Sequence, residues 1–149
     1  MRRLVWAIDP ENDAVSNIAA KIRSDKSMIL GDDIHFHLNV GPEILQTALK
    51  GEIRYQLLSI INEGLNNISK YAQAKNVWID LTRNGKFVHL NIRDDGVGFD
   101  TSEIKNDKVK ATGYGLKNME KRVTRVNGKL VVTSVPGQGT TINVTVPSR

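Results

Sequence analysis

Four polar residues lie on one segment whose apolar residues recur at strongly helical spacing, and their side chains can bind a phosphate group and its cation. Glu63, Asn67 and Lys70 are four and three residues apart, so a helix would place them along one stripe, with Tyr71 beside Lys70. The amide oxygen of Asn67 is a hard ligand of the kind that Mg²⁺ takes in proteins. Lys70 can face a phosphate. The alternative interpretation is an ordinary polar edge of a helix.

Three glycine-containing segments follow, and each has a chemical and a purely structural interpretation. Asp94 to Gly98 comes at the end of a predicted strand, where a carboxylate can accept a hydrogen bond from an amino group such as that of adenine. Gly113 to Leu116 is predicted to open a helix, whose free N–H groups favour an anion. Gly137 to Thr141 is predicted to turn the last hairpin. Each segment alone also fits a plain turn, and none is a P-loop.

The elements that would position these residues follow from apolar periodicity. Helices are predicted at about 14–23, 51–73 and 116–126, and strands at 34–40, 77–81, 87–92, 130–135 and 140–146. Residues 96–115 are predicted to form a long loop, and Asn127-Gly128 to stop a helix. The order does not interleave helices and strands regularly. It therefore predicts an α+β, two-layer α/β sandwich, with one mixed, mostly antiparallel sheet and helices on one face.

Length and composition narrow the class of protein. The 149 residues suit one domain, and the chain contains no cysteine and no apolar run near the roughly 20 residues that span a bilayer. We therefore expect a cytoplasmic fragment that is not itself inserted in a membrane, although a parent protein could be anchored. The net charge of +5 is scattered, and no basic run alternates with aromatics. No nucleic-acid partner is predicted. His35 and His37 share one face of their strand, and we expect that face to be solvated rather than to bind a metal.

The ordered set of motifs resembles the Bergerat-type ATP-binding fold, and more closely the sensor histidine kinases. The match runs from about Leu4 to Pro147. The segment Ile61-Asn62-Glu63-Gly64-Leu65-Asn66-Asn67-Ile68-Ser69-Lys70-Tyr71-Ala72 is similar to their N box, in the form of the nitrate-sensor branch, which usually has His where this chain has Tyr71. Residues 4–10 resemble the segment that joins the dimerisation helices to the catalytic domain. The resemblance implies a linker and N-terminal helix over 1–24, and a catalytic ATP-binding domain over 25–149.

The resemblance also implies roles for individual residues. Asn67 would ligate Mg²⁺, and Glu63 would orient that site or act as a base. Asp94 would bind the adenine amino group, and residues 99–112 would form a mobile lid. Contacts to ATP would come from Asn67, Lys70, Tyr71, Asp94, Gly96, Gly98, Gly113, Gly115, Leu116 and Thr140.

The implied activity is transfer of the ATP γ-phosphoryl group to a histidine on a separate dimerisation domain, for relay to a response regulator. His35, His37 and His89 lie on predicted strands, so none is expected to be the phosphoacceptor. Little turnover is therefore expected from the chain alone. The main alternative is an anti-sigma factor, a serine kinase of the same fold. Two others are an ATP-gated dimerising module of the mismatch-repair, topoisomerase or chaperone type, and a degenerate domain that no longer binds nucleotide.

Overall fold

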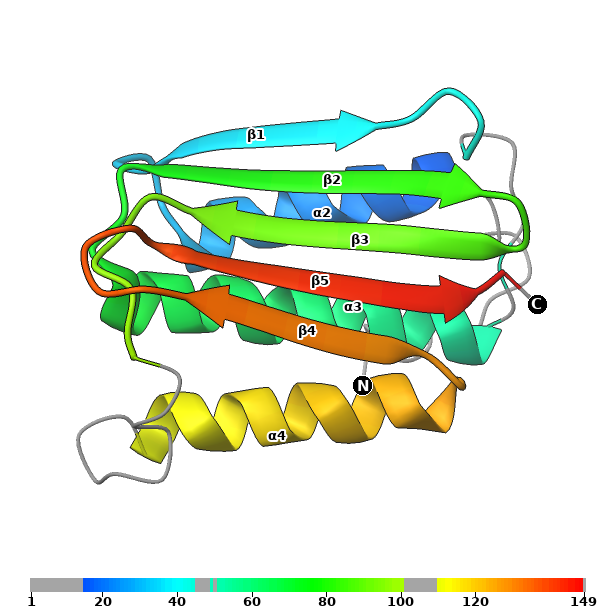
Figure 1. The fold of residues 1–149 in the computed structure, drawn as a ribbon. Coiled ribbons are helices and arrows are strands. Elements are labelled where there is room, and N and C mark those ends of the chain that lie inside the picture. Colours follow the sequence, from blue (N-terminus) through cyan, green and yellow to red (C-terminus); the bar gives the residue numbers. More distant parts are fainter. Residues whose placement is uncertain (1–14, 45–48, 50, 101–109, 149) are drawn as a thin grey trace.

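A five-stranded sheet forms one layer of the protein and three helices form the other (Figure 1). The computed structural model describes residues 15–44, 49, 51–100 and 110–148. The strands are β1 (His35–Val40), β2 (Asn76–Asn84), β3 (Phe87–Asp94), β4 (Lys129–Ser134) and β5 (Thr140–Pro147). Their order across the sheet is β1-β2-β3-β5-β4, and only the β1–β2 pair is parallel. The predicted α+β sandwich with a mixed, mostly antiparallel sheet is confirmed.

Alternation of side chains gives the sheet one apolar and one polar face. Val88, Leu90 and Ile92 of β3 are at most 1% exposed, and they stand opposite Val146, Val144 and Ile142 of β5. The other face carries polar and aromatic groups. There the rings of His37 and Trp78 stack at a centroid distance of 5.4 Å, and the Arg93 guanidinium lies 4.1 Å from the Trp78 ring. His35 and His37 are exposed on this face, as their alternation with apolar residues predicts.

The helices all cover the apolar face (Figure 1). They are α2 (Val15–Ile29), α3 (Gly51–Asn67), which continues directly into a π-helix, η2 (Ile68–Ala72), and α4 (Lys110–Arg125). On α4 the buried residues Leu116, Met119 and Val123 recur at spacings of three and four, so one stripe of the helix meets the core. No helix in the described ranges is long and apolar enough to cross a membrane.

Two boundaries differ from the sequence prediction. Helix α2 extends to Ile29 rather than to about residue 23, because Leu30 is still buried in the core. The helix stops there because Gly31, with φ of +71°, adopts the left-handed conformation that closes a helix. Helix α4 begins at Lys110, six residues before the predicted start at Leu116. Glycines depress helix propensity but do not forbid a helix when a buried stripe follows them. The segments 1–14 and 101–109, which include the predicted joining segment and most of the predicted lid, lie outside the described residues.

The end of α4 agrees with the predicted helix stop. Asn127 has φ of +59°, the left-handed conformation that closes a helix. The N–H of Gly128 donates to the carbonyl of Val123 at 2.8 Å, and the N–H of Asn127 donates to that of Thr124 at 3.1 Å. These two bonds form a Schellman motif, which satisfies carbonyl groups that the helix leaves unpaired. The chain then enters β4 at Lys129.

Candidate functional site

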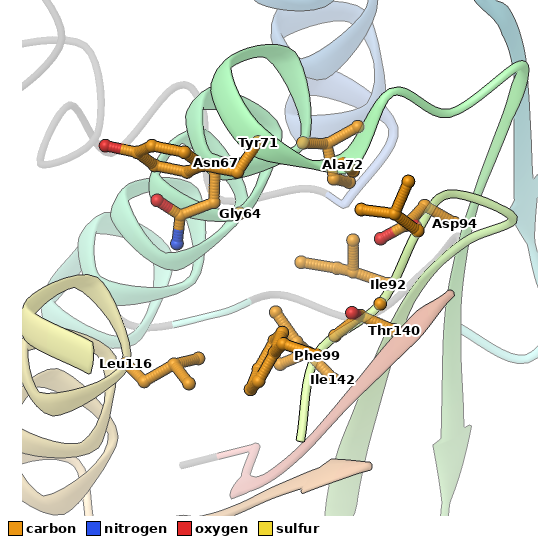
Figure 2. Close-up of a pocket in the computed structure, with 13 residues that line it drawn as sticks. Gly64, Asn67, Tyr71, Ala72, Ile92, Asp94, Phe99, Leu116, Thr140 and Ile142 are labelled. Carbon is orange, nitrogen blue, oxygen red and sulfur yellow. The ribbon is translucent and has the colours of Figure 1, made fainter. Parts of the chain in front are cut away.

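A cavity of about 250 Å³ opens between α3, the loop after β3, and the start of β5 (Figure 2). Most of its wall is apolar, and its polar groups come from only a few places. It is lined by Gly64, Asn67, Ile68, Tyr71, Ala72, Ile92, Asp94, Val97, Gly98, Phe99, Leu116, Thr140 and Ile142. An apolar cavity with a few convergent polar groups is the usual form of a site for a small organic ligand.

Asp94 supplies the carboxylate at one end of the cavity. It is the last residue of β3 and is only 5% exposed. The backbone N–H of Gly96 donates to its Oδ1 at 2.8 Å. Burial raises the pKa of the Asp94 carboxyl; hydrogen bonds from the Gly96 and Thr140 backbones oppose this rise, and the charge of Asp95 adds to it. A buried carboxylate that faces an apolar cavity can orient a ligand that presents an N–H donor.

The glycines after Asp94 let the loop pack against protein backbone. A Cβ on Gly96 would lie 2.1 Å from the carbonyl oxygen of Ala72, and one on Gly98 would lie 2.2 Å from that of Val135. Gly98 also has φ of +63°, which glycine adopts without strain. Between them, the N–H of Val97 donates to the Ala72 carbonyl at 2.7 Å. The loop is therefore held between η2 and the last hairpin. The glycines permit a close approach to the backbone of other parts of the protein, whereas the sequence resemblance implied a contact with the nucleotide.

Asp95 serves the fold rather than the cavity. Its Oδ1 accepts the backbone N–H groups of Lys75 and Asn76 at 2.9 and 2.8 Å, and its Oδ2 accepts Nδ2 of Asn76 at 3.0 Å. Burial alone would raise the pKa of Asp95, but these hydrogen bonds to its charged form lower it. Of the two neighbouring carboxylates, one thus faces the cavity and the other fixes the entry into β2.

The other end of the cavity is formed by the end of α3. Asn67 is the last α-helical residue, and its Nδ2 is buried without a hydrogen-bond partner among the described residues. Tyr71 is 45% exposed and lines the mouth (Figure 2). Lys70 is exposed and is absent from the cavity wall. The turn from Ile68 to Ala72 is π-helical, a form that often occurs at functional sites, and it shifts Lys70 and Tyr71 from the stripe that a regular α-helix predicts.

The second glycine segment is placed differently from the prediction. Gly113, Gly115 and Leu116 lie within α4 and do not open it, because the helix begins at Lys110. Leu116 still lines the cavity. A Cβ on Gly115 would lie 2.8 Å from Nδ2 of Asn67 and 3.1 Å from Oε1 of Glu63. The lack of a side chain at Gly115 thus leaves room for the two groups predicted to serve the cation.

An amide oxygen and a carboxylate next to each other are ligands that a hard divalent cation prefers. Oδ1 of Asn67 and Oε1 of Glu63 both reach the same small space beside Gly115, at 3.3 and 3.1 Å from the position of a Cβ there. Nδ2 of Asn67, unpartnered among the described residues, is a hydrogen-bond donor, which suits a phosphate oxygen rather than the cation. The residues present therefore fit Mg²⁺. The described residues contain no cluster of three His, Asp or Glu side chains that would hold a metal by protein ligands alone. A cation here would accordingly take its other oxygen ligands from water or from a bound phosphate.

Several residues of the site carry no signal in the sequence. Ile92 and Ile142 form the floor of the cavity, but their alternation only marks them as core. Gly64 packs against that floor, since a Cβ there would lie 3.2 Å from Cδ1 of Ile92. Ser134 does not touch the cavity, yet its hydroxyl contacts Thr140 at 2.8 Å. A serine at a strand end gives no hint of such a contact, because its partners lie on other segments.

Comparisons with known proteins agree with this geometry. Residues 52–149 match the family described as histidine kinase-, DNA gyrase B-, and HSP90-like ATPase. The chain is 35% identical to the sensor histidine kinase LiaS of Bacillus subtilis over 105 residues, which is 70% of this chain and 28% of LiaS. It is 29% identical to the oxygen sensor histidine kinase NreB of Staphylococcus carnosus over 148 residues, which is 91% of this chain and 42% of NreB. The chain thus spans less than half the length of these relatives.

A solved structure shows the same fold. The mycobacterial sensor histidine kinase MprB aligns with a TM-score of 0.71 and 20% sequence identity, covering 91% of this chain and 95% of that one. At this identity the likeness concerns the fold alone.

Proposed function

Because the chain belongs to the family of histidine kinase-, DNA gyrase B- and HSP90-like ATPases and is the ATP-binding catalytic domain of a sensor histidine kinase, we propose that its cavity binds ATP and presents the γ-phosphoryl group to a histidine of a separate domain. The adenine would lie at Asp94 and the phosphates toward Asn67. One observation carries this proposal: a single apolar cavity has a buried carboxylate at one end and an unsatisfied amide at the other.

The base end discriminates by hydrogen bonding. The Asp94 carboxylate accepts from the 6-amino group of adenine, while Ile92 and Ile142 contact the face of the ring. A hydrogen bond to a charged, partly buried partner is worth about 1.5–3 kcal/mol. Because the Gly96 N–H already fixes Oδ1, the carboxylate is oriented before the ligand arrives.

The phosphate end positions the reacting group. Phosphoryl transfer requires mainly positioning and neutralisation of charge. When bound, Mg²⁺ would neutralise phosphate charge, held by Asn67 with Glu63 orienting the site. Tyr71 closes the mouth beside Asn67, and the exposed Lys70 would approach the phosphates from outside the cavity wall. Gly96 and Gly98 hold the loop after Asp94 against protein backbone, and Gly115 leaves room for Asn67 and Glu63.

The rest of the pathway lies beyond this chain. The phosphoacceptor histidine would belong to a dimerisation domain of the parent protein, and a response regulator would receive the phosphoryl group. We place the division between linker and catalytic domain near residue 24, within α2, and the domain in the cytoplasm. The curated relatives are sensor histidine kinases, which favours this function over an anti-sigma factor.

Titration calorimetry with Mg-ATP tests the proposal on three forms of the chain: native, Asp94→Asn and the matched control Asp80→Asn. Asp80 points from β2 to the open face of the sheet, away from the cavity. We expect Asp94→Asn to weaken binding at least tenfold and Asp80→Asn to leave it unchanged. Burial raises the pKa of Asp94, so its charged form is costly at neutral pH, and the amide variant should remain folded. A folded native chain that binds no Mg-ATP would refute the proposal.

A further inference from the structure

One buried hydroxyl joins three segments behind the base end of the cavity. Ser134 ends β4 and is 8% exposed. Its Oγ accepts the backbone N–H of Phe99 at 2.8 Å and donates to the carbonyl of Gly139 at 3.1 Å. It also lies 2.8 Å from Oγ1 of Thr140. Ser134 therefore connects the loop after β3, the last hairpin turn and the first residue of β5, although it is not part of the cavity wall.

Counting protons fixes the direction of the bond between the two hydroxyls. A serine hydroxyl has one proton and two lone pairs. The proton of Ser134 is used by Gly139, whose carbonyl can only accept. The hydroxyl of Thr140 must then donate to Ser134, and the second lone pair of Ser134 receives it. All three contacts of Ser134 are satisfied only in this arrangement.

Thr140 is left without a proton for the cavity that it lines. Thr140 stands directly opposite Asp94 in the β3–β5 register, so the two side chains meet at the same end of the cavity (Figure 2). The Asp94 carboxylate, when ionised, is also an acceptor only. The base end thus presents two acceptors side by side and no side-chain donor from this pair.

We propose that Ser134 is a positioning residue that holds Thr140 as a hydrogen-bond acceptor, and so sets the preference of the cavity for a base that presents an amino group. The inference rests on the proposed ATP function and concerns the choice of base. Adenine offers the two N–H bonds of its 6-amino group to these acceptors. Hypoxanthine presents a carbonyl oxygen at the 6-position, which would face these acceptors, and it offers only the single N1–H donor in place of the two N–H bonds of the amino group. Without Ser134, Thr140 can turn its proton toward that oxygen.

The experiment compares binding of Mg-ATP and Mg-ITP by calorimetry, and the diagnostic quantity is the ratio of the two dissociation constants. The native chain should prefer ATP. Ser134→Ala should reduce the ratio of the ITP to the ATP dissociation constant roughly fivefold, which corresponds to the free energy of one neutral hydrogen bond. Thr140→Val, which removes the same acceptor, should narrow it by a similar factor. The double variant should match Thr140→Val alone, because Ser134 acts through Thr140.

Controls separate positioning from general damage. Ser148→Ala removes another buried serine hydroxyl, at the opposite end of β5, and should leave the ratio unchanged. If Ser134→Ala does not fold, Ser134→Cys serves instead, because its thiol is only a weak hydrogen-bond partner. A purely structural role of Ser134 would weaken both nucleotides equally and leave the ratio at its native value, which would overturn the inference. The inference would also be overturned if the double variant changed the ratio by the product of the two single-variant factors, because the two residues would then act independently.

The two levels of the proposal fail in different ways. A native chain that binds neither nucleotide contradicts the ATP function itself. A native chain that binds ATP in preference to ITP, with a ratio that Ser134→Ala leaves untouched, contradicts only the role of Ser134.

Discussion

Gly115→Ala separates two explanations of the second glycine segment, namely a flexible turn and a helix that must pass close to α3. In a regular helix, Ala is more favourable than Gly by about 0.8–1 kcal/mol. The new Cβ, however, would lie 2.8 Å from Nδ2 of Asn67. The amide would have to move by about 0.6 Å to reach an ordinary contact of 3.4 Å. A side chain pushed from its rotamer costs about 0.5–1.5 kcal/mol.

The gain in helix propensity and the cost of displacing Asn67 nearly cancel in the stability of the fold, but only the displacement of Asn67 affects binding. We expect the free energy of unfolding of Gly115→Ala to lie within about 0.5 kcal/mol of the native value. Binding sites tolerate displacements of about 0.5 Å, so the shift of Asn67 should weaken Mg-ATP binding about tenfold. Urea denaturation followed by circular dichroism measures the first quantity, and calorimetry with Mg-ATP the second.

Asn118→Ala is the matched control, since Asn118 is exposed on the same helix. It should gain about 0.6 kcal/mol of stability and bind Mg-ATP normally. A loss of more than about 2 kcal/mol in Gly115→Ala would refute this reasoning, because it would mean that the side chains of Asn67 and Glu63 cannot give way to the new Cβ. Unchanged binding would mean that the position of the Asn67 amide does not matter to the nucleotide.

Three further changes have definite expected outcomes. Asn127→Gly should raise the free energy of unfolding by less than about 1 kcal/mol in urea titration, because Gly adopts φ of +59° without the strain of a Cβ and Asn tolerates that strain better than most residues. Gly139→Ala should lower it by at least about 2 kcal/mol and abolish Mg-ATP binding, because φ is +77° and its Cβ would lie 2.1 Å from the carbonyl oxygen of Asp94. Acidification should weaken Mg-ATP binding from a pH above the ordinary Asp pKa of 3.8, because burial raises the pKa of Asp94 and adenine binds its ionised form. Asp94→Asn should lack this component of the pH dependence, whereas the titration of ATP itself affects both proteins alike.

Features encoded by neighbouring residues were predictable from the sequence. The alternation of Val88, Leu90 and Ile92 predicts the buried face of β3, and these side chains are buried. The pair Asn127-Gly128 predicts the stop of α4, and its left-handed residue is found there. Both signals depend on local geometry alone, so no knowledge of distant partners is needed.

Features that depend on distant partners were not predictable. The π-helical turn at Ile68–Ala72 arises where the chain packs on the glycine loop, through the bond from Val97 to Ala72. The early start of α4 conflicts with the low helix propensity of Gly113 and Gly115. For the candidate site, the residue types of Asp94 and Asn67 suggested the two ends of the cavity. The roles proposed for these residues stay predictions until binding is measured.

The position of β5 has a consequence for the order in which the protein can be made. β5 lies between β3 and β4, so the strand that is synthesised after the other four described strands takes a place in the interior of the sheet. Until residue 147 has emerged, β3 and β4 have no strand between them, and Thr140 cannot stand opposite Asp94. A nascent chain that stalls before β5 should thus leave the backbone N–H and C=O groups of β3 unpaired along one edge and bind no nucleotide, which makes it a substrate for chaperones.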